Sequence, residues 1–421
     1  MLFAVAVPAV IAVVFWPRQV SSHETLTTTV LFDREIVRIL NKHCVMCHVE
    51  NGPSFPLSTY EDTWIRGRKI KAEVIARHMP PWAAVPGYGQ FINDNLPTLR
   101  ETQFLISWVE GLGPRNAGTV FLNVIDSGLA RPKEVRAEAD FGRWRLGTPS
   151  LMRQLPGTTI EPQQRLVTRT VVDLGLTSEA RVNGLEYMPG DRRVVRAAFF
   201  TLQATGQWLG SWTPWYGFVS LPSGAAYRLP AGSRVVAEIH YSGVKESTVE
   251  RGTLGLFFAD VPPSAGLGES RGRVTSGVGP PPNQPSDLVL EAKGDVPSGV
   301  TAKVSRAQTR LAADTYALSL WPDLPSGATS MEVSARKPDG GTEILLFAKD
   351  FQMDWPTPYI FREPRFLPRG SVVSATAYYT NATATPQPGG FRLTVSRYEK
   401  HTGPGSAVPA TARTAPPRRS P

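Results

Sequence analysis

Cysteine and histidine are scarce in this sequence, and their scarcity limits the metal chemistry that the chain can support. Only 2 cysteines and 6 histidines occur among 421 residues. Two cysteines exclude a disulfide-stapled scaffold and any protein that attaches several haems through paired thiols. Charged residues make up only 19% of the chain and apolar residues 41%, so large cores can form and general disorder is excluded.

Glycine and proline are abundant, with 37 and 38 copies, and this abundance disfavours a mainly helical bundle. Residues 30–118 nevertheless have a helical pattern, with apparent capping boxes at Ser58–Glu61 and Thr98–Glu101. Alternating apolar segments then predict two β domains, at 140–262 and 288–398. A Pro/Gly/Ser-rich linker at 263–287 separates them, and a flexible basic tail is expected at 399–421. The strongest strand predictions are 165–174, 193–202, 233–242, 252–258, 301–305, 315–321, 329–335, 343–349, 371–379 and 390–396.

The N-terminal residues 2–16 form an uninterrupted apolar run. As a helix this run would be about 22 Å long, which is shorter than a bilayer core of roughly 30 Å. The run predicts either a signal peptide within residues 1–22 or a short membrane anchor, with a buried core helix as the third alternative. The first two readings place the rest of the chain in the periplasm or at the outer face of the cytoplasmic membrane.

The two cysteines belong to a Cys44-Val45-Met46-Cys47-His48 motif, the pattern of covalent c-type haem attachment. In such a motif the two thiols form thioethers with one porphyrin, and the following imidazole ligates the iron. A zinc site that adds His43 is an alternative, although four donors within six residues cannot easily surround a tetrahedral ion. A redox-active CxxC pair is another alternative, but no βαβ pattern surrounds it. The motif predicts one covalent haem, with His48 as its first axial ligand.

The second axial ligand is expected in the Arg77-His78-Met79-Pro80-Pro81-Trp82 segment. Met79 lies 31 residues after His48, and the two prolines that follow it would stiffen the backbone around its thioether. Met79 is therefore the predicted ligand and His78 the alternative. A His/His iron would have a lower reduction potential than a His/Met iron.

These motifs resemble a known combination of domains. Residues 35–115, with RHMPPW and PGYGQFINDN after the haem motif, resemble the small all-α cytochrome c domain of bacterial proteins fused to a copper type II, ascorbate-dependent monooxygenase-like region. Residues 143–395 resemble that region, which is related to peptidylglycine hydroxylating monooxygenase, through RWRLGTPSL, LPAGSRVVAEIHYSG and SARKPDGGTEILLFAKDFQMDWP. The resemblance implies a multidomain chain in which two all-β jelly-roll sandwiches follow the cytochrome domain.

The resemblance also locates the copper ligands of the related enzymes. Their His-His pair falls on Arg196 and Ala197, and a third histidine is retained as His240. Their His-x-His pair falls near 321–325, where no histidine occurs, and no methionine follows Met353. Arginine and alanine cannot ligate copper. We therefore expect no bound copper, no catalytic residues and a single remnant histidine.

The sequence thus predicts an exported or membrane-tethered mono-haem cytochrome that transfers electrons and acts as a scaffold subunit. Its expected partners are redox proteins or subunits of a respiratory or photosynthetic membrane complex. The alternatives are a copper monooxygenase fed by the haem, and a structural or binding subunit in which haem only supports folding. The net charge of +9 lies mainly outside residues 30–115; it suits contact with anionic lipid or an acidic subunit, or plain solubility. No nucleic-acid motif occurs.

A glycine-rich loop carries a cluster of aromatic residues, Trp208, Trp212, Trp215 and Tyr216. Such a cluster indicates either core packing or a hydrophobic docking patch on the surface. The sequence leaves both readings open.

Overall fold

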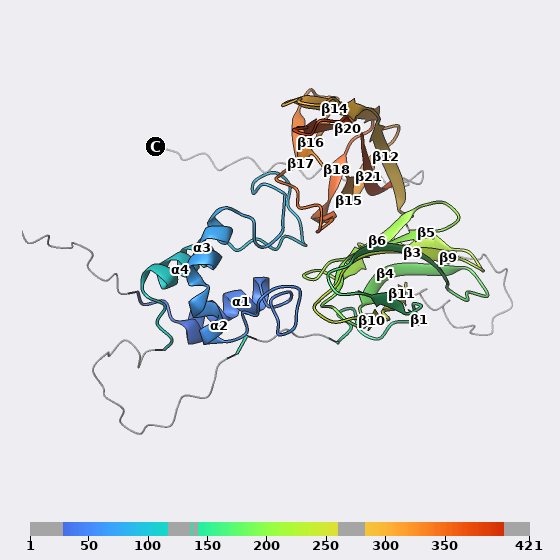
Figure 1. The fold of residues 1–421 in the computed structure, drawn as a ribbon. Helices are drawn as coiled ribbons and strands as arrows, with labels where there is room; N and C mark the ends of the chain where they lie inside the picture. Colours follow the sequence, from blue (N-terminus) through green and yellow to red (C-terminus); the bar gives the residue numbers. More distant parts are fainter. Residues whose placement is uncertain (1–27, 117–135, 138–141, 260–282, 400–421) are drawn as a thin grey trace, which may run out of the picture.

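A computed structural model describes residues 28–116, 136–137, 142–259 and 283–399, which form a helical part and two β parts (Figure 1). The predicted N-terminal segment 1–22 lies outside the described residues, as do residues 263–282 of the predicted linker 263–287 and residues 400–421 of the predicted tail 399–421. Among the described helices, none has the length and apolar character needed to cross a membrane.

The helical part is held together by one small apolar core. Its buried residues include Phe32, Ile36 and Leu40 from the first helical segment and Leu105 and Trp108 from the last. The apolar spacing of three and four residues that predicted these helices is the spacing that lines one helical face. The elements are a π-helical turn η1 (Phe32–Ile36), α1 (Val37–His43), α2 (Tyr60–Ile65), α3 (Gly67–Ile75) and α4 (Leu99–Glu110).

The predicted capping box at α4 is confirmed. Thr98 Oγ1 accepts from the Glu101 amide, and the Glu101 carboxylate accepts from the Thr98 amide. The cap of α2 lies one residue later than Ser58, because the hydroxyl that accepts from the Asp62 amide belongs to Thr59. Threonine at an N-cap satisfies a backbone donor that the helix itself leaves unpaired.

The first β part has two larger antiparallel sheets that enclose a common core, and a two-stranded sheet of β2 and β10. One sheet has the order β1-β11-β4-β7, with β8 also paired to β4, and the other has the order β3-β9-β5-β6. The strands are β1 (Leu151–Gln154), β2 (Thr158–Ile160), β3 (Arg165–Asp173), β4 (Ala180–Met188), β5 (Val195–Leu202), β6 (Trp208–Trp212), β7 (Phe218–Ser220), β8 (Tyr227–Leu229), β9 (Arg234–Ser242), β10 (Thr248–Glu250) and β11 (Thr253–Phe258).

The second β part repeats this two-layer arrangement with sheets of order β12-β21-β15-β18 and β14-β19-β16-β17. Its first strand begins at Ser286, two residues before the predicted start of the domain. The strands are β12 (Ser286–Ala292), β13 (Asp295–Val296), β14 (Lys303–Arg310), β15 (Thr315–Asp323), β16 (Ala328–Arg336), β17 (Thr342–Lys349), β18 (Tyr359–Leu367), β19 (Val372–Tyr379), β20 (Gln387–Pro388) and β21 (Phe391–Glu399). The prediction of a helical region followed by β-sandwich-like parts is thus confirmed at this level.

The connection between α3 and α4 joins the helical part to the second β part. Ala84 forms an antiparallel bridge with Ala348, and Phe91 forms one with Phe361. The rings of Trp82 and Phe91 belong to the core of the second β part. In Figure 1 this connection reaches from the helices to the strands β17 and β18.

Candidate functional site

A cavity of about 290 Å³ lies where the helical part meets both β parts. Four residues predicted from the sequence line it together: Cys44, Cys47, His48 and Met79. The remaining wall is mostly apolar, and it includes residues of the first β part and of the segment between β17 and β18. The first β part contributes Arg196 and Trp215 to the wall, and the segment between β17 and β18 contributes Asp354 and Trp355.

The haem-attachment motif occupies the turns that follow α1. The Cys44 amide donates to the Leu40 carbonyl at 2.9 Å, and the His48 amide donates to the Cys44 carbonyl at 3.0 Å. The Cys47 amide donates to the same Cys44 carbonyl at 3.1 Å. These bonds keep the chain curled after the helix ends, so both thiols and the imidazole line one cavity.

Gly52 allows the chain to pass close to the motif. A Cβ atom at this position would lie 2.9 Å from the carbonyl oxygens of Cys47 and Val49. Real Cβ atoms do not approach oxygen so closely, so only glycine fits here without movement of the backbone.

The orientation of His48 leaves one ring nitrogen available. Its Nδ1 lies 2.9 Å from the Phe55 carbonyl oxygen, which can only accept, so Nδ1 carries the hydrogen. Burial lowers the pKa of His48 below its ordinary value, which favours the neutral imidazole. Nε2 is then the nitrogen with a free lone pair, and a hydrogen-bonded Nδ1 is the arrangement that fixes a metal-binding imidazole.

Both cysteines are free thiols. Burial raises the pKa of Cys44 to about 12. Burial also raises the pKa of Cys47 to about 11, although the positive charges of Arg196 and Arg192 act against that rise. At neutral pH both free thiols are therefore protonated.

Met79 is placed by the end of α3. The His78 amide donates to the Glu73 carbonyl at 3.0 Å, and the Arg77 amide donates to the Val74 carbonyl at 3.2 Å. Arg77 has a φ of 57°. This pattern is a Schellman C-cap, which turns the chain sharply after the helix. Met79 lines the cavity after that turn.

His78, the alternative axial ligand, is exposed. Its Nδ1 lies 3.1 Å from Glu73 Oε2, and its side chain is 64% accessible to solvent. It is absent from the cavity wall that holds Met79. Of the two neighbouring candidates, only the methionine faces the motif.

His43, the extra donor of the zinc alternative, has other partners. Its Nδ1 lies 2.8 Å from the Asn95 carbonyl oxygen, and its Nε2 lies 3.4 Å from Glu101 Oε2. In the part of the chain that the structure describes, no three His, Cys, Asp or Glu side chains are grouped as metal ligands. The zinc alternative thus lacks a ligand set there.

Arg196 enters the cavity wall from β5. The register of β5 against β9 shifts between Val195 and Ala197, so Arg196 has no residue opposite it. Such a bulge redirects one side chain out of the normal alternation. Arg196 is only 7% exposed, and its guanidinium carbon lies 4.8 Å from the centre of the Trp355 ring. Sequence reasoning treated this position only as a missing copper ligand and found no role for it.

His240 lies in a different cavity, of about 230 Å³, between the two β parts. Its Nε2 lies 2.9 Å from Glu238 Oε1, and its ring packs edge-on against Phe199 at 5.8 Å. Trp321 and Asp323, from the 321–325 segment in which the sequence shows no histidine, line the same cavity. His240 therefore has a carboxylate partner of its own.

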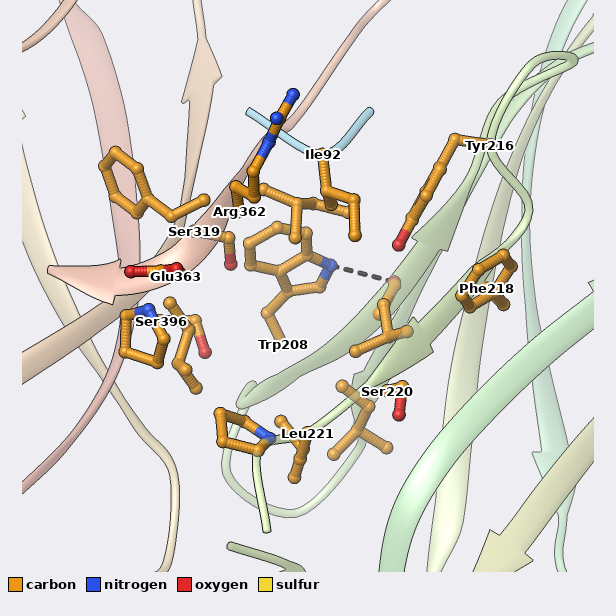
Figure 2. A pocket seen from close by; sticks show the side chains of 18 of the residues that line it. Ile92, Trp208, Tyr216, Phe218, Ser220, Leu221, Ser319, Arg362, Glu363 and Ser396 are labelled. Carbon is orange, nitrogen blue, oxygen red and sulfur yellow. Dashed lines mark hydrogen bonds between the residues drawn. The ribbon is translucent and has the colours of Figure 1, made fainter. Parts of the chain in front are cut away.

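Two of the four residues of the predicted aromatic cluster, Trp208 and Trp212, lie in strand β6 and pack inside the molecule, whereas Trp215 and Tyr216 are half-buried. Trp208 and Trp212 are 2% and 1% exposed, and the Trp208 and Trp321 rings lie 5.6 Å apart across the two β parts. Figure 2 shows Trp208 between Tyr216 and Phe218 on one side and Ser319 and Arg362 on the other, at a cavity of about 290 Å³. For Trp208 and Trp212 the reading as a surface docking patch is wrong, because their rings are buried.

Comparison with known proteins adds little to these observations. No known protein family and no curated protein matches the chain. The structure resembles the major capsid protein of bacteriophage PM2, with 8% identity over 59% of this chain and 100% of that one, at a TM-score of 0.25. It also resembles the PBSX exported protein XepA, with 8% identity over 59% and 86% of the two chains, at a TM-score of 0.17. Likenesses this distant carry no functional information.

Proposed function

We propose that this chain is a mono-haem c-type cytochrome that transfers single electrons. The observation that carries the proposal is the convergence of Cys44, Cys47, His48 and Met79 on one cavity. Each residue has the chemistry that its role requires: two free thiols for thioether formation, an imidazole with Nε2 available, and a thioether sulfur.

The residues present fit a covalently bound haem c. Cys44 and Cys47 would hold the porphyrin, with His48 and Met79 as axial donors to the iron. The haem would supply a one-electron Fe(III)/Fe(II) couple. The protein's own contribution is to fix the His48 ring through Phe55, to surround the cavity with apolar side chains and to limit the access of water.

The same proposal assigns a domain type to each of the three structural parts. The helical part would be a cytochrome c domain, and the β parts would be two jelly-roll sandwiches that act as scaffold. His240 is engaged with Glu238, and arginine and alanine occupy the positions of the paired histidines. With these residues in place of copper ligands, we propose that the β parts serve as a docking scaffold and carry out no copper chemistry. We further propose an exported location, at the periplasmic side of the membrane, with redox proteins or membrane-complex subunits as partners.

The test is covalent haem loading. Protein produced in a host that carries out c-type haem attachment should gain the mass of one haem and keep the haem absorbance after denaturation. The Cys44→Ala/Cys47→Ala double variant should lose both signals, while His240→Ala should keep both. Wild-type protein that stays free of haem, under conditions in which a control cytochrome is loaded, would overturn the proposal.

A second test concerns the axial ligand. Met79→Ala should open the iron to added ligands such as imidazole and should lower the reduction potential, because a thioether ligand favours the reduced state. His78→Ala is the matched control and should do neither. Ligand binding in His78→Ala with an unchanged Met79→Ala spectrum would reverse the assignment.

A further inference from the structure

The wall of the proposed haem cavity includes a buried positive charge that comes from the first β part. Arg196 is almost fully buried and lines the same cavity as Cys47. Burial lowers its pKa, but a guanidinium group remains charged at neutral pH. A charge in this position acts on any group bound in the cavity.

The carboxylates around this cavity already have other partners. Asp354 contacts Arg165 at 2.5 Å, and Glu73 contacts His78 at 3.1 Å. Among the described residues no carboxylate lies within ion-pair distance of Arg196. Its Nη1 donates a 3.1 Å hydrogen bond to the Arg193 carbonyl, and its guanidinium group lies over the face of the Trp355 ring. Asp354 therefore acts on Arg196 only from beyond ion-pair distance, and its carboxylate is already paired with Arg165.

Arg196 lies close enough to the motif to act on a group bound there, because its side chain lines the same cavity as Cys44, Cys47 and His48. The second cation of the wall, Lys69, lies with its Nζ 5.3 Å from the Phe55 ring centre and is solvent-exposed. Water screens an exposed charge far more than a buried one. Arg196 is therefore the stronger of the two cations.

We propose that Arg196 is a positioning residue that sets the reduction potential of the haem, so that the first β part controls the redox behaviour of the helical part. This inference rests on the proposed haem function. A fixed positive charge destabilises the ferric state, which carries one more positive charge, relative to the ferrous state. The bulge in β5 is the structural device that brings this charge to the cavity.

The inference is tested by redox titration of the haem-loaded full chain. Arg196→Met removes the charge and keeps much of the apolar stem. The equilibrium constant for haem reduction by a reference couple should fall roughly tenfold, as expected for a unit charge on the order of 10 Å away at an effective dielectric constant of about 20. In Arg196→Gln the equilibrium constant should fall by a similar factor. This second variant provides the test if Arg196→Met does not fold.

Two controls separate charge from packing. Arg196→Lys keeps the charge and should retain most of the wild-type potential. Arg169→Met removes an exposed arginine from β3 of the same sheet, where it pairs with Glu238 at 2.7 Å, and should leave the potential unchanged. An unchanged potential in Arg196→Met, or an equal drop in Arg196→Lys, would overturn the inference while leaving the haem assignment intact. Wild-type protein without haem would overturn both.

Discussion

The two β parts contact the haem-motif region in different ways. The second β part holds the connection after Met79 by backbone pairing and apolar rings, with bridges at Ala84 and Phe91 and with Trp82 in its core. The first β part instead presents a charged side chain, Arg196, to the cavity. The first contact is apolar and the second is charged. Under the proposed haem function, mutations at the two contacts should separate effects on stability from effects on the reduction potential.

The largest expected effect on stability is at the apolar contact. Trp82 is 5% exposed, and its ring lies 5.1 Å from that of Tyr359. Trp82→Ala should lower the free energy of unfolding by about 3–5 kcal/mol, because a large ring is lost from a packed core. Denaturant unfolding measures this change. Trp64→Ala is the control, since Trp64 is 55% exposed and its loss should cost much less. Equal losses would contradict the anchoring role of Trp82.

A smaller and pH-dependent effect is expected where the two β parts meet each other. Burial raises the pKa of Asp287 from 3.8 to about 6, although Oδ2 accepts a hydrogen bond from the Trp208 amide at 2.6 Å and the charges of Arg392 and Arg397 act against the rise. The folded state thus binds this proton more tightly than the unfolded state. The contribution of Asp287 to stability is full below pH 3.8 and is lost as the pH rises through about 6.

Asp287→Asn removes this titration. Relative to wild type, the variant should gain up to about 3 kcal/mol of stability between pH 4 and pH 8. Unfolding curves of both proteins across this range measure the gain. Trp82→Ala keeps Asp287, so its loss of stability relative to wild type should be the same at each pH in this range. A parallel pH dependence in Asp287→Asn and wild type would contradict the assignment.

Much of the fold could be predicted because many strands have one buried and one exposed face. The alternation in β3 and β9 is of this kind, and both strands begin and end within a residue of the prediction. The missed strands lack this signal. All five residues of β6 are buried, since the second β part covers its outer face near Trp208. In β18, Arg362, Glu363 and Arg365 interrupt the apolar pattern.

Some residues of the site could likewise be predicted from the sequence, and others could not. The haem motif and Met79 could be found from local spacing, because those residues are close in sequence or follow a helix end. Arg196 could not, since its place in the wall depends on a register shift between two strands and on the packing of separate parts. No local sequence pattern indicates that β5 packs against the helical part at this cavity.

The bridge between Phe91 and Phe361 has a consequence for synthesis. The two residues are 270 positions apart, so at roughly 5–20 residues per second the ribosome needs on the order of 15–50 s between them. During that interval the rings of Trp82 and Phe91 have no β core to enter. The helical part is therefore translated first but completed last, and a fragment that ends near residue 118 would leave those rings exposed to water.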